Sequence, residues 1–175
     1  ESCDLVPEND DCYSAIELFD ASAVDGNLCC AQPDGISCNP YGTAYGVWYY
    51  VNSQDWDSMA IELTNVSNGN VGVRVFEDAN GLGYNSACDS LVDLGVCTIV
   101  TGVIAGNIYP ELLFETDYYF LVFTEYPLAC GDFNLVINSV IYGCTDPSAD
   151  NYDSEANIPD NNNYECIYSH PPDND

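Results

Sequence analysis

The chain has 175 residues, of which 29 are Asp or Glu and only one, Arg74, is Lys or Arg, so its formal net charge is −28 at pH 7. Nucleic acids and anionic membrane surfaces both require cationic side chains, which excludes them as partners. Only 17% of the residues are charged and 47% are hydrophobic, which predicts a globular chain with an acidic surface rather than a disordered acidic tail.

The first half of the chain carries period-2 patterns typical of β-strands. In the run VGVRVF, Val71, Val73 and Val75 point to one face, whereas Arg74 and Phe76 point to the other. The predicted strands of this half are residues 14–19, which is a weak pattern, and residues 45–52, 58–64 and 71–76.

The second half continues in the same way, with strands predicted at residues 97–104 (weak), 117–124 and 132–138. Asn-Gly and Gly-Asn turns separate the runs, and no amphipathic helix is visible. Many short strands between turns predict an all-β fold, an antiparallel β-sandwich. We interpret Trp48, Tyr50, Tyr119 and Leu121 as core residues; the opposite face of each strand is left open to a sugar ring or a neighbouring subunit.

The composition changes after about residue 142, where Asp, Asn, Pro and Ser replace the apolar runs. We therefore divide the chain into a β-sandwich domain, residues 1–142, and a small loop-rich module, residues 143–175. A disulfide between Cys144 and Cys166 would close a loop of roughly 20 residues and contribute about 3 kcal/mol.

Ten cysteines in a chain of this length predict a disulfide framework formed in an oxidising, extracellular setting. Zinc ligation is disfavoured, because no CxxC spacing occurs and the one histidine lies in the tail. The sequence begins with Glu1, so we expect a mature secreted chain whose export signal has been removed, and no apolar run is long enough to insert into a membrane. The cysteines are Cys3, Cys12, Cys29, Cys30, Cys38, Cys88, Cys97, Cys130, Cys144 and Cys166.

Residues 8–140 resemble the bacterial pre-peptidase C-terminal-like domains. The resemblance is carried, in order, by NDDCYSAIEL at residues 9–18, GVWYYV, CDSLVDLGVC, DYYFLVF and GDFNLVI. It implies a jelly-roll or immunoglobulin-like β-sandwich, usually an accessory module of a secreted protein. We expect no attached protease, and the chain departs from the family in adding Cys3 and the Cys29-Cys30 pair.

The tail is similar to a repeat found in secreted bacterial and algal surface proteins. Its residues Gly143-Cys144-Thr145-Asp146-Pro147, Ala149, Asn151-Tyr152, Ala156-Asn157 and Cys166 match that repeat, whereas residues 160–165 depart from it. The two resemblances imply disulfides Cys88–Cys97 and Cys144–Cys166. For the remaining cysteines we expect short links among Cys12, Cys29, Cys30 and Cys38, with Cys3 joined to Cys130.

Calcium is the natural metal for a chain rich in carboxylate and amide oxygens. The alternative is that these groups are solvated or cap turns. The candidate ligands are Asp146, Asp150, Asn151, Asp153, Asp160 and Asn162 in the tail, and Glu8, Asp10 and Asp11 near the N-terminus.

Three short motifs predict glycosylation: Asn65 lies in an N-linked sequon, and Ser58 and Ser90 lie in Asp-Ser-apolar patterns that resemble an O-linked acceptor of some bacteria. Catalysis is not expected. The chain has no lysine, its one histidine is His170 near the C-terminus, and no pair of carboxylates stands out as an acid and base.

The leading hypothesis is a non-catalytic secreted structural subunit that self-assembles into an extracellular filament or surface layer. The alternative is a carbohydrate- or ligand-binding accessory module of a larger secreted protein. With one cation per chain, we expect contacts between identical subunits to be apolar and aromatic rather than ionic, and pairing of sandwich edge strands is a further route. The candidate patches are residues 40–51 and the acid-poor residues 97–110, with Ile99, Val100, Val103, Ile104, Ile108 and Tyr109.

Overall fold

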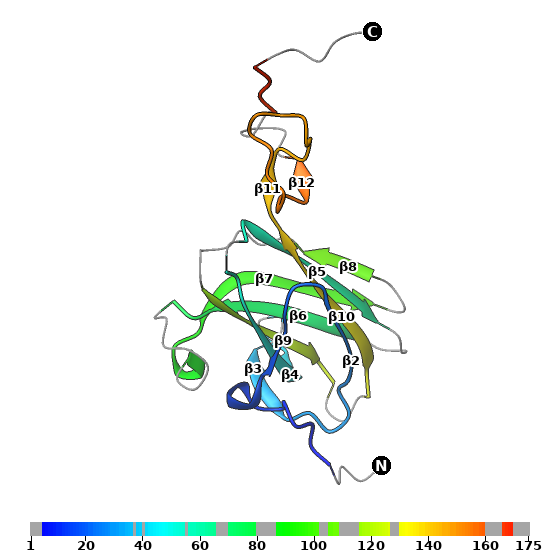
Figure 1. The fold of residues 1–175 in the computed structure, drawn as a ribbon. Coiled ribbons are helices and arrows are strands. Elements are labelled where there is room, and N and C mark those ends of the chain that lie inside the picture. The colour runs from blue at the N-terminus through cyan, green and yellow to red at the C-terminus, as the bar shows by residue number, and fades with distance from the viewer. Residues whose placement is uncertain are drawn as a thin grey trace.

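The computed structural model shows two β-sheets packed face to face, with a small C-terminal segment projecting from one end (Figure 1). The described part of the chain contains no helix with the length and apolar character to cross a membrane. The structure describes residues 5–36, 38–39, 41–54, 56–65, 70–79, 87–101, 105–108, 116–126, 130–159 and 166–169.

The first sheet has six strands in the order β1-β4-β9-β6-β7, and β3 also pairs with β4. Its pairs are antiparallel except β1 with β4. The strands are β1 (Ile16–Glu17), β3 (Pro33–Ile36), β4 (Thr43–Asn52), β6 (Asn70–Glu77), β7 (Val92–Thr101) and β9 (Asp117–Thr124).

The second sheet has four antiparallel strands in the order β2-β10-β5-β8. The C-terminal segment, residues 141–159 and 166–169, carries a parallel pair, β11 with β12. Two 3-10 turns, η1 (Cys12–Ser14) and η2 (Ala87–Asp89), complete the described elements. The strands are β2 (Ser22–Asn27), β5 (Ser58–Asn65), β8 (Ala105–Ile108), β10 (Asp132–Val140), β11 (Tyr142–Gly143) and β12 (Ile158–Pro159).

The core between the sheets follows the predicted alternation. Val71, Val73 and Val75 of β6 are fully buried, whereas Arg74 lies on the opposite face with its guanidinium over the ring of Phe76. The prediction of an all-β sandwich and its five strong strands is therefore confirmed.

The outer face of the six-stranded sheet is also buried, which the sequence left open. Trp48, Tyr119, Leu121 and Phe123 form a second apolar cluster on that face, and the N-terminal residues, the β3–β4 connection and η2 contribute the residues that cover it. Tyr50 stacks on Tyr119 within this cluster, with ring centroids 5.6 Å apart. These rings are therefore packed inside the chain and do not form an open platform for a sugar.

Asn9 fills the gap that β1 and β3 leave along the edge of β4. Its carbonyl oxygen accepts from the Trp48 backbone N–H (2.7 Å), and its side-chain Nδ2 donates to the Trp48 carbonyl (2.9 Å). Asn9 is buried and thus pairs with β4 as a strand residue would. The edge of β4 is therefore closed to further strand pairing along this stretch.

The weak strand predictions shift for local reasons. The predicted strand at residues 14–19 contracts to β1, because η1 precedes it and a turn at Ala21 (φ 57°) follows. The predicted strand at residues 97–104 instead begins at Val92. It contains a bulge in which Gly95 adopts φ +70°, a conformation that glycine reaches without strain.

The disulfides differ from most of the expected pairings. Cys12 pairs with Cys88, Cys38 with Cys97, and Cys29 with Cys130. The predictions of Cys88–Cys97, of Cys3–Cys130 and of short links among the early cysteines are therefore wrong. Cys97 lies on the outer face of β7, where it meets the β3–β4 connection instead of the nearby η2. Cys144 pairs with Cys166, Cys30 is also disulfide-bonded, and Cys3 lies outside the described residues.

Candidate functional site

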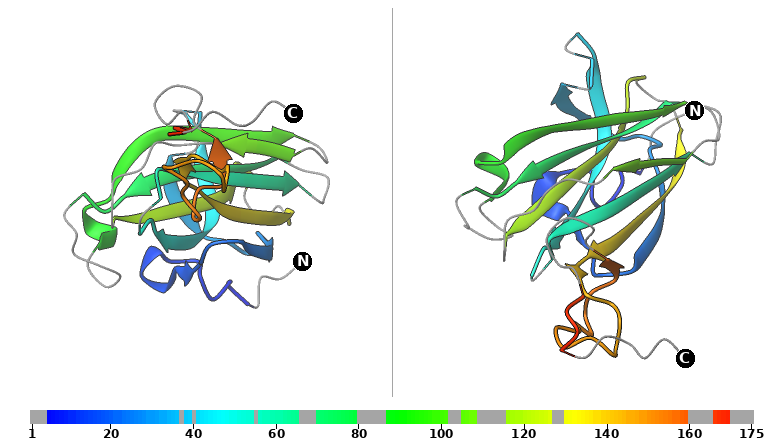
Figure 2. Two further views of the ribbon diagram at one scale, coloured as in Figure 1. Left: turned by 45° about the horizontal axis from the view of Figure 1, so that its top comes forward. Right: turned by 90° about the horizontal axis from the view of Figure 1, so that it is seen from above.

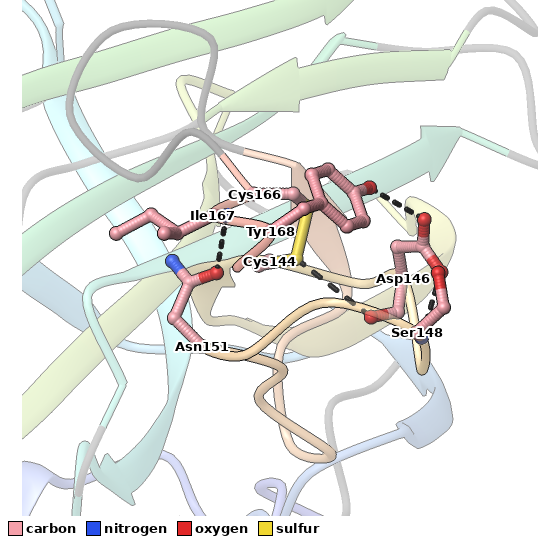
Figure 3. The surroundings of a disulfide bond; sticks show 7 residues. All are labelled: Cys144, Asp146, Ser148, Asn151, Cys166, Ile167 and Tyr168. Atoms are coloured by element: carbon pink, nitrogen blue, oxygen red, sulfur yellow. Dashed lines mark hydrogen bonds between the residues drawn. A yellow bond between two sulfur atoms is a disulfide. The ribbon is translucent and has the colours of Figure 1, made fainter. Parts of the chain in front are cut away.

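The C-terminal segment is held together by one disulfide and a ring of polar contacts (Figure 3). Ile167 is pinned on both sides of its backbone: its N–H donates to Asn151 Oδ1 (2.7 Å) and its carbonyl accepts from the Asp150 N–H (2.7 Å). The Tyr168 hydroxyl donates to Asp146 Oδ2 (2.5 Å), and Ser148 donates its N–H and hydroxyl to Asp146 Oδ1. These donors lower the pKa of Asp146, most strongly through Tyr168.

The predicted calcium ligands of the tail are thus largely engaged with their own chain. Asp150 accepts from Ser169, and Asp153 accepts from the Glu155 N–H (2.9 Å). Among the described residues, no group of three or more His, Cys, Asp or Glu is arranged to hold a metal ion. Asp160 and Asn162 lie outside the described residues, so calcium at this segment stays a prediction.

The N-terminal acids also act on the backbone. Asp10 accepts from the Gln32 N–H (2.6 Å), Asp11 caps η1 by accepting from the Tyr13 N–H (3.0 Å), and Glu8 is exposed. Burial and the nearby Asp11 raise the pKa of Asp10, against the lowering effect of the Gln32 N–H. The two aspartates thus tie the N-terminal residues to the start of β3 and to their own turn.

Asp34 of β3 is a half-buried acid that the sequence did not single out, because Asp34-Gly35 looks like an ordinary turn. Its Oδ1 accepts from Trp48 Nε1 (3.0 Å), but its Oδ2 is buried and has no hydrogen-bond partner among the residues that the structure describes. Burial, reinforced by the charges of Asp10 and Asp11, outweighs the Trp48 and Gly46 hydrogen bonds and raises the pKa of Asp34 to about 6.

Two predicted surface sites are wrong because the side chains are buried. Ser58 is 4% exposed, so its hydroxyl is not an accessible glycosylation acceptor, and Val100 is 4% exposed within the main core, so it does not lie at an interface. Ile99 is half-buried against the outer cluster, and Ser90 is half-buried. Asn65 and Ile108 lie on described strands, but the structure does not describe their side chains. Val103, Ile104 and Tyr109 lie outside the described residues.

Most of the large exposed apolar side chains that the structure describes gather at two ends of the molecule; Tyr13 of η1 and Val92 of β7 are exposed outside these two groups. The hairpin end is where β3 turns into β4; it carries Tyr41, and Tyr126 lies there too, because Thr124 pairs with Tyr45. The N-terminal residues run on the same side (Figure 1), with Leu5 and Val6 exposed. The segment end, where the C-terminal segment joins the sandwich, carries Phe19, Tyr142, Tyr152, Ile158, Ile167 and Tyr168.

A cleft of about 470 Å³ lies at the segment end, where the sandwich and the C-terminal segment meet. Asp57 contributes from the sandwich side, and Asp153 and Glu155 contribute from the segment. Asp57 Oδ2 accepts from the Tyr142 N–H (2.7 Å), which fixes that carboxylate at the rim. The remaining wall is formed by Ile141, Tyr142, Gly143, Cys144 and Asn151.

No family model matches this chain, and no curated protein matches it. Among solved structures, it is similar to the pre-peptidase C-terminal domain of a collagenase from Bacillus anthracis, with 13% identity, a TM-score of 0.46, and coverage of 71% of this chain and 94% of that chain. It is also similar to a surface-associated copper-binding protein of Methylomicrobium album BG8 (10% identity, TM-score 0.48, 71% and 97% covered). A third similar structure is a periplasmic inhibitor of g-type lysozyme from Aeromonas hydrophila (10% identity, TM-score 0.41, 71% and 94% covered).

The first of these is the type of domain that residues 8–140 resemble. At these identities and TM-scores the likeness adds nothing beyond the β-sandwich that the strands already define, and it transfers no ligand or activity to this chain. The four described disulfides are typical of a protein that folds in an oxidising compartment outside the cytosol.

Proposed function

We propose that this protein is a non-catalytic, secreted structural subunit that self-assembles through its two apolar ends into an extracellular filament or surface layer. The observation that carries the proposal is the placement of exposed apolar side chains at both the hairpin end and the segment end. Contacts between two different patches at opposite ends of a subunit are heterologous, and they generate open chains wherever the rotation from one subunit to the next does not close a ring.

The charge of the chain supports apolar contacts over ionic ones. The single cation, Arg74, is paired with Asp93 inside the subunit, and its side chain is only 16% exposed. Within the part of the chain that the structure describes, a neighbouring copy therefore offers no free cation to the acidic surface. The net charge of −28 opposes association, and salt should weaken this repulsion by screening over roughly 8–10 Å.

Light scattering and negative-stain imaging across a salt series test the proposal. We expect particle size to grow with salt and to fall again on desalting. Calcium remains a proposed ligand of the acidic segment, so the series includes calcium and magnesium at matched ionic strength; a larger effect of calcium supports a site, and equal effects indicate screening alone. A protein that stays monomeric in every condition, in native material as well, contradicts self-assembly.

A further inference from the structure

We propose that Tyr41 of one subunit inserts into the cleft at the segment end of a second copy, so that subunits join head to tail. This inference rests on the proposed self-assembly and names the contact that would produce it. It starts from two features that the fold places at opposite ends: a nearly fully exposed aromatic side chain and a cleft lined by carboxylates and apolar groups.

Tyr41 is presented at the tip of the β3–β4 turn and is 96% exposed. The turn is closed by Asn39, whose Oδ1 accepts from the Tyr41 N–H (3.1 Å) and whose carbonyl accepts from the Gly42 N–H (2.8 Å). Cys38 at the base of this turn is linked to Cys97 on β7. The disulfide fixes the base of the turn, and the turn projects the tyrosine away from the sandwich. Because the turn is already ordered, docking the tyrosine costs less entropy.

The cleft offers what a tyrosine side chain needs. Its volume of about 470 Å³ lies within the range of small-molecule sites, roughly 300–1,000 Å³. Ile141 and Tyr142 supply an apolar wall for the ring. A phenol hydroxyl donates strongly to a carboxylate, so the acidic rim is a suitable acceptor for Tyr41 in a chain that has almost no cations.

The carboxylates of the cleft retain free acceptor capacity. Asp57 uses Oδ2 for the Tyr142 N–H, and Asp153 uses Oδ1 for the Glu155 N–H. The second oxygen of each, together with the Glu155 carboxylate, has no hydrogen-bond donor within the part of the chain that the structure describes. A donor from a neighbouring subunit would satisfy these acceptors.

A subunit cannot fill its own cleft. Tyr41 precedes β4, whereas Asp57 lies beyond the far end of β4, and ten extended residues separate the two ends by about 30 Å. In both Figure 1 and the right panel of Figure 2, the β3–β4 hairpin and the C-terminal segment point away from each other. The contact is thus intermolecular and heterologous, and repeating it propagates a chain.

Two substitutions remove the two halves of the contact. Tyr41→Ala removes the inserted side chain, and Glu155→Lys places an ammonium group among the cleft carboxylates, where it occupies the acceptors. Tyr41 makes no apolar packing contact at 96% exposure, and Glu155 is exposed, so both variants should keep the wild-type melting temperature. Tyr13→Ala is the control, because Tyr13 is an exposed tyrosine of η1, between Asn9 and β1, and lies at neither of the two ends.

Sedimentation velocity and native mass spectrometry measure the outcome under the salt conditions that assemble the wild-type protein. We expect Tyr41→Ala and Glu155→Lys each to weaken association by about tenfold or more, and Tyr13→Ala to leave it nearly unchanged. Tyr41→Phe keeps the ring but loses the hydroxyl donor, so its association should be weaker than that of the wild-type protein and stronger than that of Tyr41→Ala. An equimolar mixture of Tyr41→Ala and Glu155→Lys should form a 1:1 dimer and stop there, because each chain keeps the half that the other lacks.

Four other results would contradict the proposed contact between Tyr41 and the cleft. Wild-type assembly by both variants, or equal losses in Tyr41→Ala and Tyr13→Ala, contradicts the inference but leaves self-assembly standing. A wild-type chain that binds a lysine-rich peptide through the cleft without self-associating points to a cationic partner and contradicts the inference. A wild-type chain that is monomeric throughout contradicts the proposed function as well.

Discussion

The covered outer face of the six-stranded sheet and the C-terminal segment are both held by disulfides, but the first is apolar and the second is polar. On the outer face, Cys12–Cys88 and Cys38–Cys97 join residues 76 and 59 positions apart and hold loops over packed aromatic rings. In the C-terminal segment, Cys144–Cys166 joins residues 22 positions apart and closes a polar loop. The two long disulfides therefore hold loops over an apolar surface. The short disulfide stabilises a polar segment that has little apolar core of its own.

Removing one disulfide from each region should give the largest difference. Chain entropy alone assigns roughly 4.5 kcal/mol to the 76-residue separation and roughly 3.4 kcal/mol to the 22-residue one. Losing Cys12–Cys88 also releases the cover of Trp48 and Tyr119. We expect the Cys12→Ser/Cys88→Ser variant to lower the urea midpoint of the whole sandwich, and Cys144→Ser/Cys166→Ser to expose only the segment to protease. Equal midpoint shifts would show that the regions unfold as one unit.

A pair of asparagine variants sharpens the comparison at the level of single hydrogen bonds. Asn9→Ala leaves the Trp48 carbonyl without its Nδ2 donor in a buried setting, which should cost about 1–3 kcal/mol of unfolding free energy. Asn151→Ala removes the acceptor for the Ile167 N–H in the C-terminal segment, where water can replace it. Chemical denaturation followed by tryptophan fluorescence should therefore respond to Asn9→Ala and hardly to Asn151→Ala; Asn138→Ala, at an exposed position of β10, serves as the control. A null effect of Asn9→Ala would show that the β4 edge does not need its side chain.

The acids of the two regions should respond to pH with opposite signs. The folded-state pKa of Asp34 is about 6, above its usual 3.8, so the native state binds more protons and stability falls as pH rises from about 4 to 6. The pKa of Asp146 is lowered, so its contribution is present above pH 3.8 and is lost as pH falls through the folded-state value.

Asp34→Asn should therefore flatten the fall in the urea midpoint between pH 4 and 6, and Asp146→Asn should make no difference in that window. The effect is expected to be smaller than that of Asn9→Ala, because Asp34 is partly screened by solvent. Parallel pH profiles for the wild-type protein and Asp34→Asn would show that the buried carboxyl is not the titrating group.

The sandwich was largely predictable because alternation records which face of a strand is buried. Val71, Val73 and Val75 carry that signal in the sequence itself. The strand β2 does not: Asp25-Gly26-Asn27 is typical of a turn, and only pairing with β10 makes it a strand.

The long-range features were not predictable. The partner of Cys97 depends on which loops cross the outer face, which is a matter of tertiary packing; the local Cys88–Cys97 pairing implied by resemblance was accordingly wrong. The Asp34 carboxyl was missed for the same reason, since its burial depends on Trp48 of the neighbouring strand. Proximity in sequence was a good guide only in the C-terminal segment, where Cys144 and Cys166 lie in one loop.

The course of β4 and β10 bears on how the protein would carry mechanical load. A tensile force applied between the hairpin end and the segment end acts along both strands, since β4 begins at the first end and β10 runs directly through Ile141 into the second. Their hydrogen bonds to neighbouring strands lie across that force and are loaded together in shear, so they cannot open one by one like a zipper. A filament joined at these ends would therefore pull each subunit along the direction in which its sheets best resist unfolding by force.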